Sequence, residues 1–346
     1  MREIAVFGGS AHPALAAEIC AHLGVPLRPV RLRRFANDCL EVQLQENCRE
    51  RDVFLIQPLG PPVQENLVEL LLMLDAARGA SAARVTAVIP HYAYARSDKK
   101  DMPRVSIGGR LVADLLVTAG VSRILAMTLH APQVHGFFSV PVDHLHALRE
   151  LAHHFSCRDL SNTVVVSPDL GNAKPATALA RMLDLPVAAG AKERHSDAHV
   201  TISSIIGEVA GREVIVLDDE IARGTTILEL LAVLRARGAR SVRIACTHGL
   251  FVDGALERIS ARPEVLEIVC TNTVPVPAST VSVGTGPAGT VPGSIMTAPS
   301  GGPAADEDVV TAAKAKLHVI SVAPALAEAI RRIHEGESVS ALFDPS

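Results

Sequence analysis

The chain has 346 residues, a formal net charge of −4, and 48% hydrophobic against 20% charged residues. This length favours two α/β domains or one large one, and the composition excludes wholesale disorder. The negative net charge argues against a nucleic-acid partner, and no apolar stretch of membrane-spanning length is free of charge and proline, which argues against a membrane partner.

The six cysteines are scattered along the chain, and none forms a Cys-x-x-Cys pair or shows zinc-ligand spacing. Cys246 and Cys270 lie inside apolar runs, which favours core positions. Residues Met1–Ser10 carry no signal-peptide pattern. We therefore expect free thiols and a cytoplasmic location.

Short apolar runs alternate with helical patterns along the chain, which predicts an α/β fold with mostly parallel sheets flanked by helices. The expected strands are Ile4–Phe7, Val53–Gln57, Val85–Ile89, Ile124–Met127, Val164–Ser167, Val214–Leu217, Val242–Ala245, Ile268–Cys270 and His318–Ala323. The expected helices are Pro13–Leu23, Asn66–Arg78, Ile107–Thr118, Ala173–Leu183, Thr226–Arg237 and Pro324–Ile333.

The alternation divides into two comparable halves. We predict an N-terminal domain at residues 1–147, with residues 324–346 packing back on it, and a C-terminal domain at residues 148–323. Residues 277–312 form a stretch rich in Gly, Pro, Ser, Thr and Ala. Such a segment buries too little apolar area to offset its ordering entropy, so we expect a disordered surface insertion there.

The strongest local signal is the segment Val214–Thr226, in which an apolar strand ends in Asp218 and Asp219 and a Gly-Thr-Thr turn opens a helix. A helix N-terminus offers backbone N–H groups to a phosphate, and Gly224 allows a close approach. Paired carboxylates suit ribose hydroxyls or a hydrated Mg²⁺. The alternative is that the two acids only cap the turn, which would be a costly use of adjacent acids.

This segment resembles the phosphoribosyl-diphosphate binding motif of phosphoribosyltransferases and of ribose-phosphate diphosphokinases. Further segments are similar to the diphosphokinases, and they appear in the same order over nearly the whole chain outside residues 277–317. They are the nucleotide loop Tyr94–Lys100, the histidine signature His130–Phe138 followed by Asp143, the loop Ser167–Gly171, the catalytic loop Lys192-Glu193-Arg194, and the C-terminal helix and tail Ala327–Ser340.

The resemblance implies two domains of phosphoribosyltransferase type, assembled as homodimers into hexamers. It also implies the reaction, in which ribose 5-phosphate attacks the β-phosphorus of Mg·ATP through its anomeric hydroxyl, giving 5-phosphoribosyl 1-diphosphate and AMP. The expected partners are thus ATP, ribose 5-phosphate and further copies of the chain, and the expected cofactor is Mg²⁺.

The resemblance and the chemistry of phosphoryl transfer together assign roles to the candidate residues. Transfer of an anionic group depends on positioning and charge neutralisation, which suits Lys192 and Arg194 as catalytic cations in a polar stretch that could close as a lid. Without the other motifs, an ordinary solvated charge run would be the better interpretation of both residues. His130 is the third catalytic candidate, as a metal ligand or as a hydrogen-bond partner of a phosphate.

The remaining candidates bind substrates or metal. Phe35 is either an adenine contact to a neighbouring protomer or a core residue. The candidate ATP-binding residues are Phe35, Asn37, Arg96, Ser97 and Lys99. The candidate ribose 5-phosphate residues are Asp169, Asp218, Asp219, Arg223, Gly224, Thr225 and Thr226, and the candidate metal ligands are His130, Asp169 and Asp143.

Several site positions depart from the family pattern. The family usually has an acid at Thr128, Ser139 and Cys39, Gln at Ser97, Asp-Thr at Ala222-Arg223, Gly at Asn172 and a basic residue at Pro175. Two interpretations follow: an active, divergent enzyme, which we favour because the candidate catalytic cations remain, or a regulatory paralogue with weak or no activity. A plain phosphoribosyltransferase is the third alternative, against which the two-domain length and the Lys192-Glu193-Arg194 loop both argue.

Overall fold

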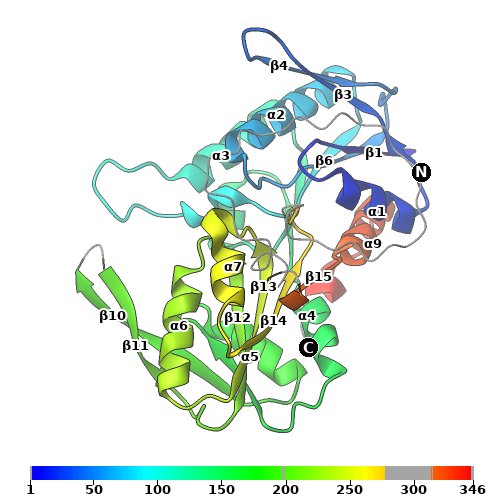
Figure 1. The fold of residues 1–346 in the computed structure, drawn as a ribbon. Helices are drawn as coiled ribbons and strands as arrows, with labels where there is room; N and C mark the ends of the chain where they lie inside the picture. The colour runs from blue at the N-terminus through cyan, green and yellow to red at the C-terminus, as the bar shows by residue number, and fades with distance from the viewer. Residues whose placement is uncertain (1, 197–198, 277–312, 314, 344–346) are drawn as a thin grey trace.

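The computed structural model describes the chain except for residues 1, 197–198, 277–312, 314 and 344–346. For residues 192–196 and 199–201 the structure describes the backbone but not the side chains. The expected insertion at residues 277–312 lies outside the described residues. Two large sheets organise the molecule, the N-terminal sheet in the upper half of Figure 1 and the C-terminal sheet in the lower half.

The N-terminal sheet is parallel throughout, with the strand order β2-β1-β5-β6-β7-β8. All five residues of β5 are buried, as expected where helices cover both faces of a parallel sheet. Helices α2 and α3 share a core with one face, and α1 shares a core with the other. The elements are β1 (Ile4–Gly8), α1 (Pro13–Leu23), β2 (Leu27–Arg28), β5 (Asp52–Ile56), α2 (Val63–Gly79), β6 (Arg84–Ile89), α3 (Gly108–Ala119), β7 (Arg123–Met127) and β8 (Val142–Leu145).

The C-terminal sheet has the strand order β11-β10-β9-β12-β13-β14-β15 and is parallel except for the β10–β11 hairpin. Helices α4 and α5 share a core with one face, and α6 and α7 share a core with the other. The elements are α4 (Leu148–Ser156), β9 (Thr163–Ser167), α5 (Ala173–Met182), β10 (Val187–Ser196), β11 (His199–Ile206), β12 (Glu213–Ile221), α6 (Thr225–Ala236), β13 (Ser241–Gly249), α7 (Ala255–Ser260), β14 (Val265–Thr271) and β15 (Leu317–Ile320).

The C-terminal helix α9 (Ala323–Glu335) lies beside α1, on the N-terminal sheet (Figure 1). Leu326 and Ile330 belong to the same buried cluster as Leu15. Arg84 on β6 donates to the backbone oxygen of Ile333 at 2.9 Å, which attaches the end of α9 to that sheet. A short helix, α10 (Ser340–Phe343), follows.

Two hairpins were not among the predicted elements. The first, β3 (Val30–Arg34) with β4 (Leu40–Leu44), carries Phe35 in its turn and projects from the end of the molecule distant from the C-terminal sheet (Figure 1). Phe35 is exposed, with the Arg33 guanidinium 4.8 Å from its ring centroid, so core packing does not explain it. The second hairpin, β10–β11, carries Lys192 and Arg194 on a strand, where the sequence suggested a polar loop.

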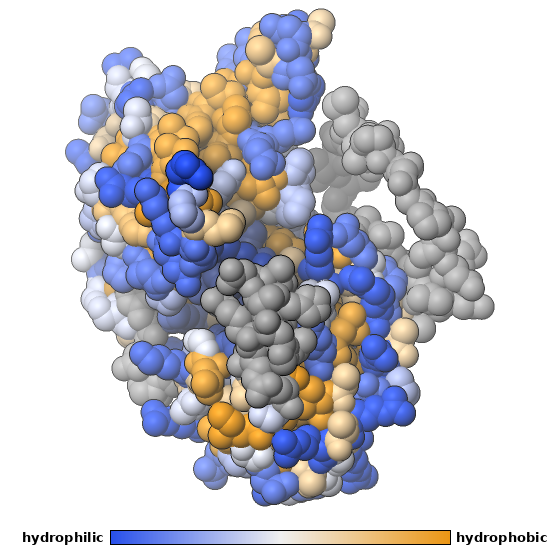
Figure 2. Space-filling model, turned by 90° about the vertical axis from the view of Figure 1, so that its left-hand side faces the viewer, coloured by the Kyte–Doolittle hydropathy of each residue, from blue (hydrophilic) through white to orange (hydrophobic). Residues whose placement is uncertain are grey.

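Helices α2 and α3 also present apolar side chains outward. Val68 on α2, and Leu111 and Leu115 on α3, are exposed. Figure 2 shows a broad apolar area over the upper half of the face that it displays. No helix in the described part of the chain is long and apolar enough to cross a bilayer.

Candidate active site

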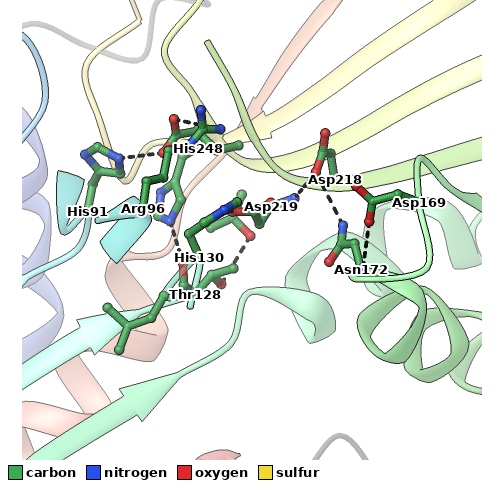
Figure 3. Close-up of polar contacts among 12 residues, drawn as sticks. His91, Arg96, Thr128, His130, Asp169, Asn172, Asp218, Asp219 and His248 are labelled. Carbon is green, nitrogen blue, oxygen red and sulfur yellow. Dashed lines mark hydrogen bonds and ion pairs between the residues drawn. The ribbon is translucent and has the colours of Figure 1, made fainter. Parts of the chain in front are cut away.

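The predicted polar residues gather where strands of the two sheets end toward each other. Asp218 and Asp219 lie at the end of β12, Asp169 follows β9, and His130 follows β7 of the other sheet (Figure 3). Open α/β sheets bind ligands outside the carboxyl ends of their strands. The two halves of the chain therefore contribute to one site.

The loop after β9 is organised by Asn172. Its backbone N–H donates to Asp169 Oδ1 at 3.0 Å, and its side-chain amide lies 3.4 Å from Asp218 Oδ1 (Figure 3). The same amide donates to the backbone oxygen of Leu217 at 3.2 Å. Asn172, one of the departures from the family pattern, thus connects the two strand ends that carry the carboxylates.

The pKa values of the adjacent acids Asp218 and Asp219 are shifted in opposite directions. Burial, and then the charge of Asp219, raise the pKa of Asp218 well above 3.8. Burial also acts to raise the pKa of Asp219, but the hydrogen bond and charge of His130 outweigh it and lower this pKa to about 2. The two adjacent acids of this strand end therefore have pKa values shifted in opposite directions, upward for Asp218 and downward for Asp219.

His130 reaches across the boundary between the two sheets. Its Nδ1 lies 2.6 Å from Asp219 Oδ2, and the hydrogen bond that it donates to Asp219 raises the pKa of the imidazole against the effect of burial. A charge-assisted bond of this length fixes the imidazole relative to the end of β12. Candidate residues 89 positions apart in the sequence are thereby brought into direct contact.

A second contact between the halves lies one residue further along β12. Glu220 Oε2 lies 3.0 Å from His91 Nε2, and Glu220 Oε1 lies 3.2 Å from Arg96 Nη2. His248, at the end of β13, lies 2.9 Å from the backbone oxygen of Thr128 through its Nε2. His91, Glu220 and His248 were not among the predicted site residues, although each stands directly after or within the end of an apolar strand.

The turn between β12 and α6 adjoins a cleft at the start of the helix. Gly224 has φ +70°, and a Cβ at that position would lie 2.8 Å from Ile259 Cδ1, so only glycine fits without strain. Thr225 and Thr226 open α6. A cleft of about 620 Å³ adjoins this turn and is lined by Arg96, His130, Asp169, Asp218, Asp219, Glu220, Ile221, Ala222, Arg223, Gly224, Thr225, Thr226, Ile227 and Val252.

A second cleft of about 630 Å³ meets the first at His130, Asp218 and Asp219. Thr128 lines it, with its own hydroxyl accepting from the Ala147 backbone N–H at 3.3 Å. Other lining residues include Leu129, Pro132, Gln133, His146, Leu148, Leu170, Gly171, Asn172, Lys174, Pro175, Ala178, Leu217 and Thr247. The three shared residues therefore stand between two spaces, as an acceptor and a donor substrate require.

Arg223 and Asp143 have charged partners of their own. Arg223 Nε lies 3.0 Å from Asp253 Oδ2, at the rim of the first cleft. Asp143, on β8, accepts from Arg123 at 2.6 Å. The carboxylate of Asp143 is thus committed to an ion pair with a neighbouring strand, and its expected role as a metal ligand stays a prediction.

The remaining ATP candidates are spread more widely. Ser97 Oγ accepts from the Gly108 backbone N–H at 2.8 Å, where it supports the start of α3. Lys99 Nζ lies 3.6 Å from Asp101. Asn37 lies in the β3–β4 turn beside Phe35, away from the clefts of the same chain. Lys192 and Arg194 pair through their backbones with Ile202 and Val200 of β11.

The carboxylates suit magnesium in their chemistry. No group of three or more His, Cys, Asp or Glu side chains among the described residues is arranged to hold a metal ion. Mg²⁺ does not require such a group, because it commonly takes one or two carboxylates and completes its shell with phosphate oxygens and water. Asp169 and Asp218, which both hydrogen-bond to Asn172, are the side chains that would hold it.

Comparison with known families covers both halves of the chain. Residues 4–120 match the N-terminal domain of ribose phosphate pyrophosphokinase, and residues 143–275 match the phosphoribosyl transferase domain. The chain belongs to the ribose-phosphate pyrophosphokinase family. This membership confirms the predicted fold class, two α/β domains of phosphoribosyltransferase type, and the predicted enzyme class of diphosphotransferase.

Similar proteins agree over nearly the full length of this family member. A putative ribose-phosphate pyrophosphokinase of Streptomyces coelicolor is 67% identical over 99% of this chain and 98% of its own length. A ribose-phosphate pyrophosphokinase of Deinococcus radiodurans is 46% identical over 98% of this chain and 97% of its own. The crystal structure of phosphoribosylpyrophosphate synthetase from Mycobacterium smegmatis superposes with a TM-score of 0.82 at 35% identity, covering 97% of this chain and all of that one.

Proposed function

We propose that the chain transfers diphosphate from Mg·ATP to the anomeric hydroxyl of ribose 5-phosphate, giving 5-phosphoribosyl 1-diphosphate and AMP. The observation that carries this proposal is the contact between His130 and Asp219, since it joins a nucleotide-side histidine to a ribose-side acid between two clefts. Both reactants must meet at one point for such a transfer, and His130, Asp218 and Asp219 mark that point.

The acceptor sugar phosphate fits the part of the first cleft at the β12–α6 turn, and the part at His130 and Arg96, where the second cleft joins, receives the donor triphosphate. The N–H groups of the Gly224-Thr225-Thr226 turn bind the 5-phosphate at the start of α6. Asp218 and Asp219 take the vicinal hydroxyls, which donate to their carboxylate oxygens. The side chain of Arg223, at the rim, exchanges its contact with Asp253 for the phosphate.

The donor triphosphate lies beside His130 and Arg96, and Lys192 and Arg194 neutralise the charge of the migrating group from the β10–β11 hairpin. Ser97 and Lys99 complete the nucleotide loop, and Phe35 and Asn37 bind adenine of a neighbouring protomer. Mg²⁺ held by Asp169 would draw negative charge away from the diphosphate when bound. His130 orients a phosphate oxygen, and its contact with Asp219 raises the pKa of the imidazole, which favours the protonated form.

The chain assembles with further copies of itself, as dimers within a hexamer. The exposed apolar side chains of α2 and α3 support this, because a contiguous apolar area on a protein of this kind is commonly an interface. We further propose that residues 1–147 with 324–346 and residues 148–323 form the two domains. A cytoplasmic location is supported by the six free cysteines.

The test is incubation of the purified chain with ATP, Mg²⁺ and ribose 5-phosphate, with AMP measured by chromatography. Formation of AMP that depends on ribose 5-phosphate supports the proposal. A folded, assembled protein that forms no AMP would identify a regulatory paralogue. Release of diphosphate that requires a nucleobase and 5-phosphoribosyl 1-diphosphate would identify a phosphoribosyltransferase.

A further inference from the structure

Glu220 is a buried carboxylate that lies directly after the acid pair of the site. Its side chain is 8% exposed, and its two oxygens contact His91 and Arg96, which both follow β6 in the N-terminal half. A carboxylate buried to this degree is costly unless both oxygens are satisfied. Loss of His91 or Arg96 would leave an oxygen of this buried carboxylate unsatisfied, so both contacts stabilise the Glu220 side chain in its position.

His91 is itself held on three sides. Its Nδ1 lies 3.1 Å from the backbone oxygen of Leu59, and its ring meets the ring of His248 edge to face at 4.7 Å between centroids. His91 Nδ1 contacts the Leu59 carbonyl oxygen and Nε2 contacts the Glu220 carboxylate, so both ring nitrogens have a partner. His91 therefore holds the Glu220 carboxylate in place, and this carboxylate in turn orients Arg96.

Arg96 extends from this buried anchor into the first cleft. Its side chain is half-exposed, and it lines the cleft together with His130, Asp218 and Asp219. The contact with Glu220 occupies one Nη group, whereas a guanidinium carries five N–H donors in a planar fork. Glu220 consequently sets the plane of a cation in the first cleft, which also contains the three residues that the two clefts share.

Successive side chains of a strand point to opposite faces. Asp219 therefore attaches the end of β12 to His130 on one side, and Glu220 attaches it to His91 and Arg96 on the other. The same strand end carries Asp218, so movement of β12 would move the ribose-side acids and the nucleotide-side cations together.

We propose that Glu220 is a positioning residue that aims Arg96 at the triphosphate donor and keeps this cation in register with the ribose-side acids. This inference rests on the proposed function. It predicts that loss of the Glu220 charge affects the donor nucleotide more than the sugar phosphate, because Arg96 is the group that loses its orientation.

The variants Glu220→Gln and Glu220→Asp test the proposal, with Glu267→Gln as the matched control. Glu267 on β14 is also buried, and its closest partners are also one histidine and one arginine, His154 at 2.7 Å and Arg158 at 2.6 Å, with His318 at 3.6 Å and Arg243 at 3.8 Å further away. Glu267→Gln therefore removes a comparable buried charge without touching Arg96.

For Glu220→Gln we expect a KM for ATP about tenfold higher, as befits the loss of a hydrogen bond to a charged group, with the KM for ribose 5-phosphate unchanged. Glu220→Asp should recover part of the loss because it restores the charge. Affinity for α,β-methylene-ATP, measured by calorimetry, should fall in parallel. In an Arg96→Gln background the Glu220→Gln change should add little, since both act through one group.

Equal rises in both KM values, an equal effect of Glu267→Gln, or an additive double variant would overturn the proposal. A wild-type chain that forms no AMP refutes the proposed function instead. In that case the calorimetric comparison of wild type with Glu220→Gln still decides whether Glu220 orients a triphosphate site. An unchanged affinity for the analogue would refute the assignment of Glu220.

Discussion

The contact between His130 and Asp219 permits a quantitative prediction. Asp219→Asn removes the carboxylate that lies 2.6 Å from His130 while leaving the size of the side chain unchanged. The pKa of His130 should then fall from its raised value, because the hydrogen bond that His130 donates to Asp219 is the largest cause of the rise. The free energy of unfolding should fall as well.

The magnitude follows from the pKa of Asp219. A carboxyl with a pKa of about 2 in place of 3.8 corresponds to about 2.4 kcal/mol of stabilisation at neutral pH. The His130 side chain is 43% exposed, and solvent screening reduces the expected loss on substitution to about 1 kcal/mol. Asp219→Asn also removes the repulsion between the Asp218 and Asp219 side chains, which further reduces the expected loss of stability.

The sign of the pH dependence is fixed by the two groups. The depressed pKa of Asp219 stabilises the fold above pH 3.8 and ceases to do so as the pH falls toward 2. The raised pKa of His130 stabilises the fold below pH 6.5, and this contribution is lost as the pH rises through the raised value. The loss on Asp219→Asn should therefore be larger at about pH 5.5 than at about pH 9.

Histidine NMR titration of wild type and Asp219→Asn provides the assay, with thermal unfolding at the two pH values alongside it. Assignment of the His130 signal uses a His130→Gln variant. The same His130 pKa in both proteins, or a stability difference that grows with pH, would refute the reasoning.

Three further variants test other parts of the site. Lys192→Ala should lower kcat about 100-fold with the fold intact by circular dichroism, because a positioned cation acts on the transition state, and an unchanged kcat would remove Lys192 from the mechanism. Asp218→Asn should raise the KM for ribose 5-phosphate, since carboxylates bind hydroxyls more strongly than amides do, and steady-state kinetics with a constant KM would contradict this. Gly224→Ala should weaken binding of the sugar phosphate, measured by calorimetry, because φ is +70° and the new methyl group meets Ile259 at 2.8 Å; wild-type affinity would show that the turn tolerates a side chain.

The regular part of the fold could be predicted from the sequence because buried parallel strands have an unmistakable pattern. The runs around Val53–Gln57 and Val214–Leu217 are continuous and apolar, and both became central strands, β5 and β12. The β10–β11 hairpin was missed because the segment Lys192–His199 is polar. The pairing of β10 with β11 depends on backbone contacts that composition does not reveal. The β3–β4 hairpin was missed although Val30–Arg34 and Leu40–Leu44 alternate apolar and polar residues, which is the pattern of a half-exposed strand.

The candidate site could be predicted where a motif is local. Asp218, Asp219 and Gly224 are neighbours in sequence, so their turn was visible directly. The partners of Glu220 were not, because His91 lies 129 positions away and nothing in its own surroundings marks it as a partner. The available signal was the run Asp218-Asp219-Glu220 after the apolar residues Val214–Leu217. A third acid buried at the end of a strand requires a cationic or hydrogen-bonding partner, which would have pointed to a contact for Glu220.

The most direct test of the central claim follows the oxygen of the anomeric hydroxyl. Ribose 5-phosphate labelled with ¹⁸O at this position is converted with ATP and Mg²⁺, and the products are examined by ³¹P NMR and mass spectrometry. The account predicts that the label remains in the bridge between C1 and the β-phosphorus of ATP, with unlabelled AMP. A product without the label in that bridge would mean that the C1–oxygen bond breaks, which contradicts the account.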